Sequence, residues 1–190
     1  MSSTSLTASQ LRAIYGEPRT LVAEAWASSL EATTRTFIEA SPFVLLSSTN
    51  AEGFIDISPR GGTPGFIKIV DNHSIQFLDQ LGNRKLHTFR NLSDNSKVGL
   101  CFMIPGVKEV LRAHGTAKVA NNVAMIESMG GVPEKNPVVV TINLHKIFPH
   151  CSNALNLAGL WSPDTWQDVK EGGIPSLLEM ARALAEARNA

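Results

Sequence analysis

Residues 82–85 have the composition of a phosphate-binding turn. Gly82 frees the backbone for a tight turn, and Asn83 is a good N-cap residue for a following helix. Arg84 and Lys85 would place two cations beside the open amide donors of the first helical turn, an arrangement that suits a phosphate. The alternative interpretation is an ordinary helix start with two solvated cations.

A second polar segment lies upstream, at residues 56–62. It follows the apolar residues Phe54 and Ile55, and an apolar run at residues 74–78 leads in the same way into the first segment. We therefore expect two strands to carry polar residues to adjacent ends of one sheet.

Two patterns predict the strands that position these segments. Apolar and polar residues alternate along them, and they are rich in β-branched residues. Pro105 and Gly106 are typical of the centre of a type II turn, and Asp71 and Asn72 are typical of a hairpin turn. The runs form meandering antiparallel hairpins, and six or more such strands imply a barrel. The expected strands are residues 43–48, 54–58, 66–70, 74–78, 97–104, 109–119 and 138–148.

Helices are expected before, within and after this set of strands. Thr7 and Gln10 form a capping-box pattern that opens a short helix, which Gly16 ends. Apolar residues repeat at spacings of three and four along residues 21–40, which predicts one amphipathic helix ended by Pro42. Further helices are expected from the turn at residues 82–85 to the polar cluster at 93–96, over residues 122–129, and after Pro175.

Length and composition suit one domain over residues 1–190. The chain is 43% apolar and carries 17 basic and 17 acidic side chains, so its formal net charge is zero. Such a chain can bury a substantial core. A nucleic-acid binder usually carries a basic excess, so we expect no nucleic-acid partner and no membrane partner.

The two cysteines and the first residues predict a cytoplasmic protein. Cys101 and Cys151 are far apart in the sequence and are expected to be free thiols in a reducing cytosol. The first five residues have neither the basic start nor the apolar run of a signal peptide, and no stretch is long enough to span a bilayer.

The sequence lacks a dinucleotide fingerprint, a P-loop, a hydrolase elbow and a zinc-protease helix. Cys151 beside His150 is the one nucleophile candidate, but adjacent residues of a strand point apart. A metal site made from His145, His150 and Cys151 would lack a fourth ligand. The residues therefore assign no catalytic group, and no metal site is expected.

The two polar segments, Asp56 to Gly62 and Gly82 to Lys85, resemble the pyridoxamine 5'-phosphate oxidase-like, FMN-binding split-barrel family. Ser58-Pro59-Arg60-Gly61 followed by Gly82-Asn83-Arg84-Lys85 is the pattern of one branch of it. The likeness runs from about Leu11 to Trp166 and implies a mainly β (α+β) fold. This fold is a six-stranded antiparallel split barrel over residues 43–148, flanked by helices at 7–40 and by a C-terminal segment at 149–190. The other matching residues are Ser41-Pro42-Phe43, Pro64-Gly65-Phe66, Asn91, Ile104-Pro105-Gly106, Leu111-Arg112, Gly115, His150-Cys151 and Leu160-Trp161.

The resemblance implies FMN as the cofactor and gives roles to particular residues. Arg84 and Lys85 match the phosphate-binding pair, and Asn83 would add a polar contact. Trp161 matches a tryptophan that relatives bring to the site, and its alternative role is in a core or an interface. Relatives are homodimers with each flavin at the subunit interface, so the same is expected here. Ser58, Arg60 and Gly61 match the segment that runs along the ring and its ribityl chain.

These matches predict an FMN-dependent oxidoreductase. Two departures from the family pattern indicate that its substrate is not pyridoxamine phosphate. Residues 154–161 lack the Arg-x-His element of pyridoxamine phosphate oxidases. The closer branch usually has a lysine near Asn153 and Arg-Ser where this chain has Leu157 and Ala158. The alternatives are a non-catalytic flavin-binding or sensing protein, or a split barrel that binds F420 or binds haem through His114 or His87.

Overall fold

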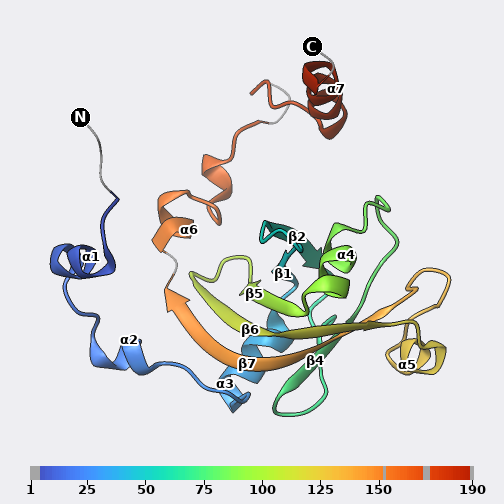
Figure 1. Ribbon diagram of the computed structural model, residues 1–190, viewed down its shortest axis with the longest axis horizontal. Coiled ribbons are helices and arrows are strands. Elements are labelled where there is room, and N and C mark those ends of the chain that lie inside the picture. Colours follow the sequence, from blue (N-terminus) through green and yellow to red (C-terminus); the bar gives the residue numbers. More distant parts are fainter. Residues whose placement is uncertain (1–4, 152, 169–171, 189–190) are drawn as a thin grey trace. The chain divides into compact units, whose positions relative to one another are not determined.

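The computed structural model describes residues 5–151, 153–168 and 172–188 (Figure 1). The chain divides into two compact units, Met1–Cys151 and Ser152–Ala190, and each is described by itself. The single domain that the sequence predicts over residues 1–190 stays a prediction.

One antiparallel sheet dominates the first unit, in the order β2-β1-β5-β6-β7-β4-β3. The mainly β fold class is therefore confirmed. The sheet has seven strands, one for each run expected from the sequence and one more than the six-stranded barrel that the resemblance implies; the strand expected over residues 66–70 is reduced to two residues, which pair with β4 at one edge. The strands are β1 (Phe43–Thr49), β2 (Ile55–Gly61), β3 (Lys68–Ile69), β4 (Ser74–Leu78), β5 (Lys97–Met103), β6 (Glu109–Ala120) and β7 (Val139–Cys151).

The hairpins predicted from the sequence form, but the chain does not follow a simple meander. β1 pairs with β2 and β3 pairs with β4, as expected. β1 also pairs with β5, and β4 also pairs with β7, so the central strands β5 and β6 separate the two hairpins. The edge strands β2 and β3 therefore stand at opposite ends of the sheet order.

The core lies on the face of the sheet where alternate residues are buried. β1 and β5 show this alternation most clearly, as a half-buried sheet requires. Helix α3 (Ala32–Ala40) contributes the fully buried Ile38 to this core. The sheet residues of the core cluster are Val44, Leu46, Ile75, Phe77, Val98, Leu100, Phe102, Leu111, Ala113, Ala117, Val140, Ile142, Leu144 and Ile147.

The first N-terminal helix forms as predicted from the sequence, but the second does not. Helix α1 (Ala8–Tyr15) begins with the predicted capping box between Thr7 and Gln10. The single helix predicted over residues 21–40 is wrong, because the chain forms α2 (Thr20–Glu24) and α3 with a break between them. In the break, Ala27 exchanges two backbone hydrogen bonds of 2.8 and 2.9 Å with Ile147 of β7. These bonds take the backbone groups that a continuous helix would need.

Helix α5 (Val123–Ser128) lies within the predicted range 122–129, and Asn122 caps it. The second unit contains α6 (Asn153–Leu157), a 3-10 turn (Pro163–Thr165) and α7 (Leu177–Arg188). In the described parts of the chain, no helix has the length and apolar character needed to cross a membrane.

Candidate functional site

A cavity of about 660 Å³ lies in the first unit where β2 faces the segment after β4. Residues 56–60 of β2 form one wall, and residues 79–89 form the other. Val119, Pro137 and Val138 complete the lining. The two polar segments singled out in the sequence therefore face each other across one cavity.

β2 presents three polar side chains on the same face. The residues of this edge strand alternate between exposed and half-buried, and Asp56, Ser58 and Arg60 are the half-buried ones that line the cavity. Successive residues of a strand point to opposite faces, so these three lie in a row.

The opposite wall is a loop with an unusual backbone. Asn83 Oδ1 accepts a hydrogen bond of 3.0 Å from the Lys85 backbone N–H, which closes a local turn. Arg84 and Leu86 have φ angles of 60° and 57°, in the left-handed region that residues other than glycine rarely adopt. Gly82, which the sequence analysis expected to free the backbone, is absent from the residues with positive φ.

Helix α4 (His87–Asp94) begins four residues later than the expected cap at Asn83. Leu86 takes the N-cap position, and its apolar side chain offers no capping hydrogen bond. The helix cannot begin earlier, because the backbones of Arg84 and Leu86 are left-handed and do not continue a right-handed helix. The prediction of Asn83 as the helix cap is therefore wrong. Arg84 and Lys85 lie in the loop before the helix and not in its first turn.

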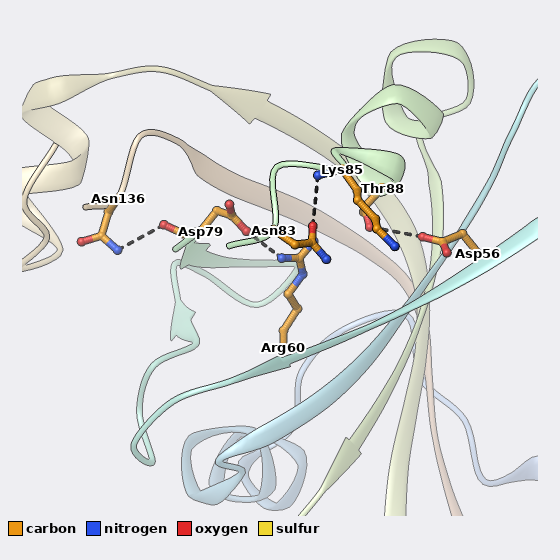
Figure 2. A network of polar contacts seen from close by, with 7 residues as sticks. All are labelled: Asp56, Arg60, Asp79, Asn83, Lys85, Thr88 and Asn136. Carbon is orange, nitrogen blue, oxygen red and sulfur yellow. Dashed lines mark hydrogen bonds and ion pairs between the residues drawn. The ribbon is translucent and has the colours of Figure 1, made fainter. Parts of the chain in front are cut away.

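An ion pair joins the two walls of the cavity (Figure 2). Arg60 Nη1 of β2 lies 2.7 Å from Asp79 Oδ1, and the exposed fractions of the two side chains are 21% and 10%. The Arg60 guanidinium also lies 5.6 Å from the centre of the Phe89 ring. Asp79 is held by its backbone, because its N–H donates to Val138 O and its carbonyl accepts from Asn136 Nδ2 at 3.1 Å.

Two further contacts attach helix α4 to the sheet. Thr88 Oγ1 donates to Asp56 Oδ2 of β2 over 3.4 Å (Figure 2). Asn91 Nδ2 donates to Ser48 Oγ of β1 over 2.9 Å, and both of these residues are buried. A buried hydrogen bond between side chains fixes the helix firmly, because losing one partner leaves the other unsatisfied.

The charges of the cavity are unevenly distributed. Burial raises the pKa of Asp79, while the Arg60 guanidinium and the Gln80 backbone N–H oppose this rise. Arg60 Nε is buried without a hydrogen-bond partner in the described structure.

The only two ion pairs between described residues are Arg60–Asp79 and Arg12–Glu17, so Arg84 and Lys85 face the cavity with their charges uncompensated.

Five of the seven predicted site residues line the cavity: Ser58, Arg60, Asn83, Arg84 and Lys85. Gly61 does not line it. A Cβ atom at Gly61 would lie 3.2 Å from the Pro42 carbonyl oxygen, so close packing against β1 accounts for this glycine. Trp161 belongs to the second unit, Ser152–Ala190.

The histidines and cysteines lie in different surroundings. His87 lines the cavity, whereas His114 packs edge-on against Phe148 at a centroid distance of 5.1 Å. The His150 ring lies 3.3 Å from Arg112 Nη2, and Cys151 is an exposed free thiol. Among the residues that the structure describes, no three His, Cys, Asp or Glu side chains are grouped to hold a metal ion.

Sequence reasoning missed Asp79 and Thr88, although both shape the cavity. Asp79 directly follows the apolar run of β4, and this position after a strand was the available signal. Its partner Arg60 is 19 residues away and on an edge strand, so no local pattern connects them.

A family model described as pyridoxamine 5'-phosphate oxidase matches residues 30–151, which is more than half of this chain. The chain belongs to the pyridoxamine 5'-phosphate oxidase family. No match was found among curated proteins.

Solved structures of two bacterial proteins share the fold of this family member. HupZ from Group A Streptococcus is 17% identical with a TM-score of 0.52, and the match covers 65% of this chain and 95% of HupZ. A putative pyridoxamine 5'-phosphate oxidase from Lactobacillus delbrueckii is 21% identical with a TM-score of 0.51, and the match covers 64% of this chain and 95% of that one. These structural matches show the split-barrel fold, and the fold predicted from the sequence is confirmed.

The titration of Asp79 predicts how stability depends on pH. Because burial raises the folded-state pKa of Asp79 above its ordinary 3.8, the folded protein binds this proton more tightly than the unfolded chain does. The contribution of Asp79 to the free energy of unfolding therefore increases as the pH falls through the folded pKa. We expect the wild type to gain stability relative to Asp79→Asn over that window, and a constant difference at higher pH. Urea unfolding across the pH range measures the free energy of unfolding of both proteins. A wild type that becomes less stable relative to the variant on acidification would contradict the prediction.

Proposed function

We propose that this protein is an FMN-dependent oxidoreductase that binds the flavin phosphate at Arg84 and Lys85. One observation carries the proposal. In a member of the pyridoxamine 5'-phosphate oxidase family, two cations that pair with no carboxylate among the described residues line the same cavity as Ser58 and Arg60.

The residues present fit a flavin mononucleotide. The cavity volume of about 660 Å³ falls within the range of roughly 300–1,000 Å³ that is usual for small-molecule and cofactor sites. A phosphate dianion would supply acceptors for the Arg84 guanidinium and the Lys85 ammonium, and charge-assisted hydrogen bonds of this kind are the strong ones. The buried Nε of Arg60 is a donor that still lacks an acceptor.

When bound, FMN would supply the electron-transfer chemistry. The protein's own residues would hold and orient it. Arg84 and Lys85 would bind the phosphate, with Asn83 keeping the turn closed through the Lys85 backbone N–H. Ser58 offers a hydroxyl in the middle of the β2 wall, between Asp56 and Arg60.

We also propose a cytoplasmic homodimer with the flavin at the subunit interface. The edge strand β2 and the turn before it expose three large apolar side chains at the wall of the cavity, which Ile57 also lines: Phe54 at 71%, Ile55 at 70% and Ile57 at 62%. Grouped exposed apolar side chains are typical of interaction surfaces. A second copy that covers this edge would remove these side chains and the free strand edge from water.

The phosphate assignment predicts a difference between two flavins. We expect Arg84→Ala/Lys85→Ala to weaken FMN binding by about ten- to a hundredfold for each lost charge-assisted contact, because each such contact contributes roughly 1.5–3 kcal/mol. Riboflavin, which has no phosphate, should bind almost as before. Titration of the ligand-free protein by flavin fluorescence measures both constants. Lys68→Ala/Lys108→Ala, which removes two exposed cations outside the cavity lining, is the matched control. Equal weakening of both flavins would show that the two cations do not bind the phosphate.

The absorption spectrum of the purified protein separates FMN from the other ligands that split barrels bind. His87 lines the cavity, so a haem ligated by this residue is the competing proposal that has a structural observation behind it. Flavin, F420 and haem absorb at different wavelengths. Turnover with a reduced nicotinamide and an electron acceptor then separates an oxidoreductase from a non-catalytic flavin-binding or sensing protein.

For the substrate, we propose an uncharged compound and not pyridoxamine 5'-phosphate. Asn153, Leu157 and Ala158 stand where closer family members usually carry a lysine, an arginine and a serine. Two lost charge-assisted contacts of roughly 1.5–3 kcal/mol each would remove most of the specific affinity for a phosphorylated substrate.

We expect the FMN-loaded protein to show no useful oxidation of pyridoxamine 5'-phosphate and to prefer uncharged over phosphorylated acceptors in a reduction screen. Leu157→Arg should restore part of the affinity for anions, with Leu178→Arg on α7 as the control for an added surface charge. Efficient turnover of pyridoxamine 5'-phosphate by the wild type would rule the proposal out.

The dimer can be tested on the same protein. Sedimentation velocity should show a species of twice the 20.5 kDa chain mass, and Ile55→Lys/Ile57→Lys on the exposed edge should shift it toward the monomer. A charged edge resists pairing with another copy. A wild-type monomer that carries flavin would contradict the proposal.

A further inference from the structure

Loop 79–86 is attached to β2 on both sides of Arg84 and Lys85. Before these cations, the Asp79 carboxylate is paired with Arg60. After them, Thr88 at the start of α4 donates to Asp56. Asp56 and Arg60 lie on the same face of β2, so one strand holds both ends of the loop (Figure 2).

The middle of the loop has few other contacts that would fix its position. Three backbone hydrogen bonds join the loop to the rest of the first unit in the described residues: Asp79 N–H to Val138 O at 3.0 Å, Leu81 N–H to Lys135 O at 3.2 Å, and Arg90 N–H of α4 to Leu86 O at 2.9 Å. For residues 82–85 of the described chain, the only recorded hydrogen bond is the local one between the Lys85 N–H and Asn83. Their position therefore depends on what holds the ends of the loop.

The backbone hydrogen bonds and the ion pair attach the start of the loop to different parts of the first unit. The first two backbone bonds tie the start of the loop to residues 135–138, on the far side of the cavity from β2. Among the hydrogen bonds and ion pairs of the described residues, the Asp79 side chain is the one that joins that side to β2, which shares no strand pairing with β4 or β7. This contact therefore holds the start of the loop, and with it the wall that carries the cations, against β2.

We infer that Asp79 is a positioning residue, whose pairing with Arg60 holds loop 79–86 against β2 in the arrangement that presents Arg84 and Lys85 to a phosphate. Asp79 does not itself bind the anion, because its charge has the same sign. It acts through Arg60 and through the loop. The part of this inference that concerns a flavin phosphate rests on the proposed function, and the part that concerns the loop does not.

The loop contains its own reporter, because trypsin cleaves after arginine and lysine and both Arg84 and Lys85 lie within it. Cleavage requires the loop to open locally, and its rate follows the open population when opening is fast. The experiment compares ligand-free wild type with Asp79→Asn, Arg60→Met and the double variant, with the products identified by mass. Glu52→Gln, in the exposed turn before β2, is the matched control for a lost carboxylate.

We expect each single variant to be cleaved at residues 84 and 85 on the order of tenfold faster than the wild type. The double variant should be cleaved no faster than either single variant, because both substitutions break the same contact. Glu52→Gln should behave as the wild type. Cleavage of Asp79→Asn at the wild-type rate, or effects that multiply in the double variant, would overturn the inference. Asp79→Glu keeps the carboxylate, so it should protect the loop better than Asp79→Asn does, and equal rates for the two would also overturn it.

FMN and riboflavin titrations of the same variants separate this inference from the proposed function. If the wild type binds FMN, Asp79→Asn should weaken FMN more than riboflavin, and it should have no such effect in the Arg60→Met background. If the wild type does not bind FMN but Asp79→Asn still speeds cleavage, the proposed cofactor is wrong and the positioning role of Asp79 is supported. If FMN binds equally to the wild type and to Asp79→Asn, the positioning role is wrong and the cofactor is unaffected.

Discussion

The ion pair between Arg60 and Asp79 connects two parts of the sheet that no strand pairing joins. In the sheet order, four strands lie between β2 and β4, yet the Asp79 carboxylate just after β4 is 2.7 Å from a guanidinium nitrogen of β2. Such a short contact between distant strands requires a strongly curved sheet, which the inherent twist of strands favours. The cavity lies between these two parts, so its existence depends on the same curvature.

Burial explains why this contact needs both partners. Asp79 is almost fully buried, and a buried carboxylate without a partner is costly. Arg60 supplies the countercharge, and the Phe89 ring lies against its guanidinium. The guanidinium of the pair thereby also contacts α4, through Phe89.

The sequence predicted those features that depend on local patterns. Alternating burial in β1 and β5 follows the alternation of their residues, and the capping box at Thr7 forms as its spacing requires. The sequence also singled out residues 56–62 and 82–85, and five of the proposed site residues in them line one cavity. The expected reason is wrong, because residues 55–61 form β2 itself and four strands separate it from β4, so the segments do not lie at adjacent strand ends.

Features that depend on distant contacts were not predictable in this way. The break at Ala27 arises from pairing with Ile147, which is 120 residues away, although the local spacing of apolar residues favours a helix. The late start of α4 comes from left-handed residues at Arg84 and Leu86, whose side chains give no local reason for that conformation. Strained backbone of this kind persists only where surrounding contacts hold it, and the two attachments to β2 are such contacts.

The distribution of charge along the cavity gives it a direction. Arg60 is compensated by Asp79, whereas Arg84 and Lys85 are not paired with any carboxylate of the described chain. An anionic group is therefore attracted more strongly by Arg84 and Lys85 than by Arg60, whose charge the Asp79 carboxylate already offsets. An anionic group placed beside the Asp79 carboxylate would also be repelled, because like charges repel. The same pair that joins the two walls thus also lowers the attraction of anions to Arg60.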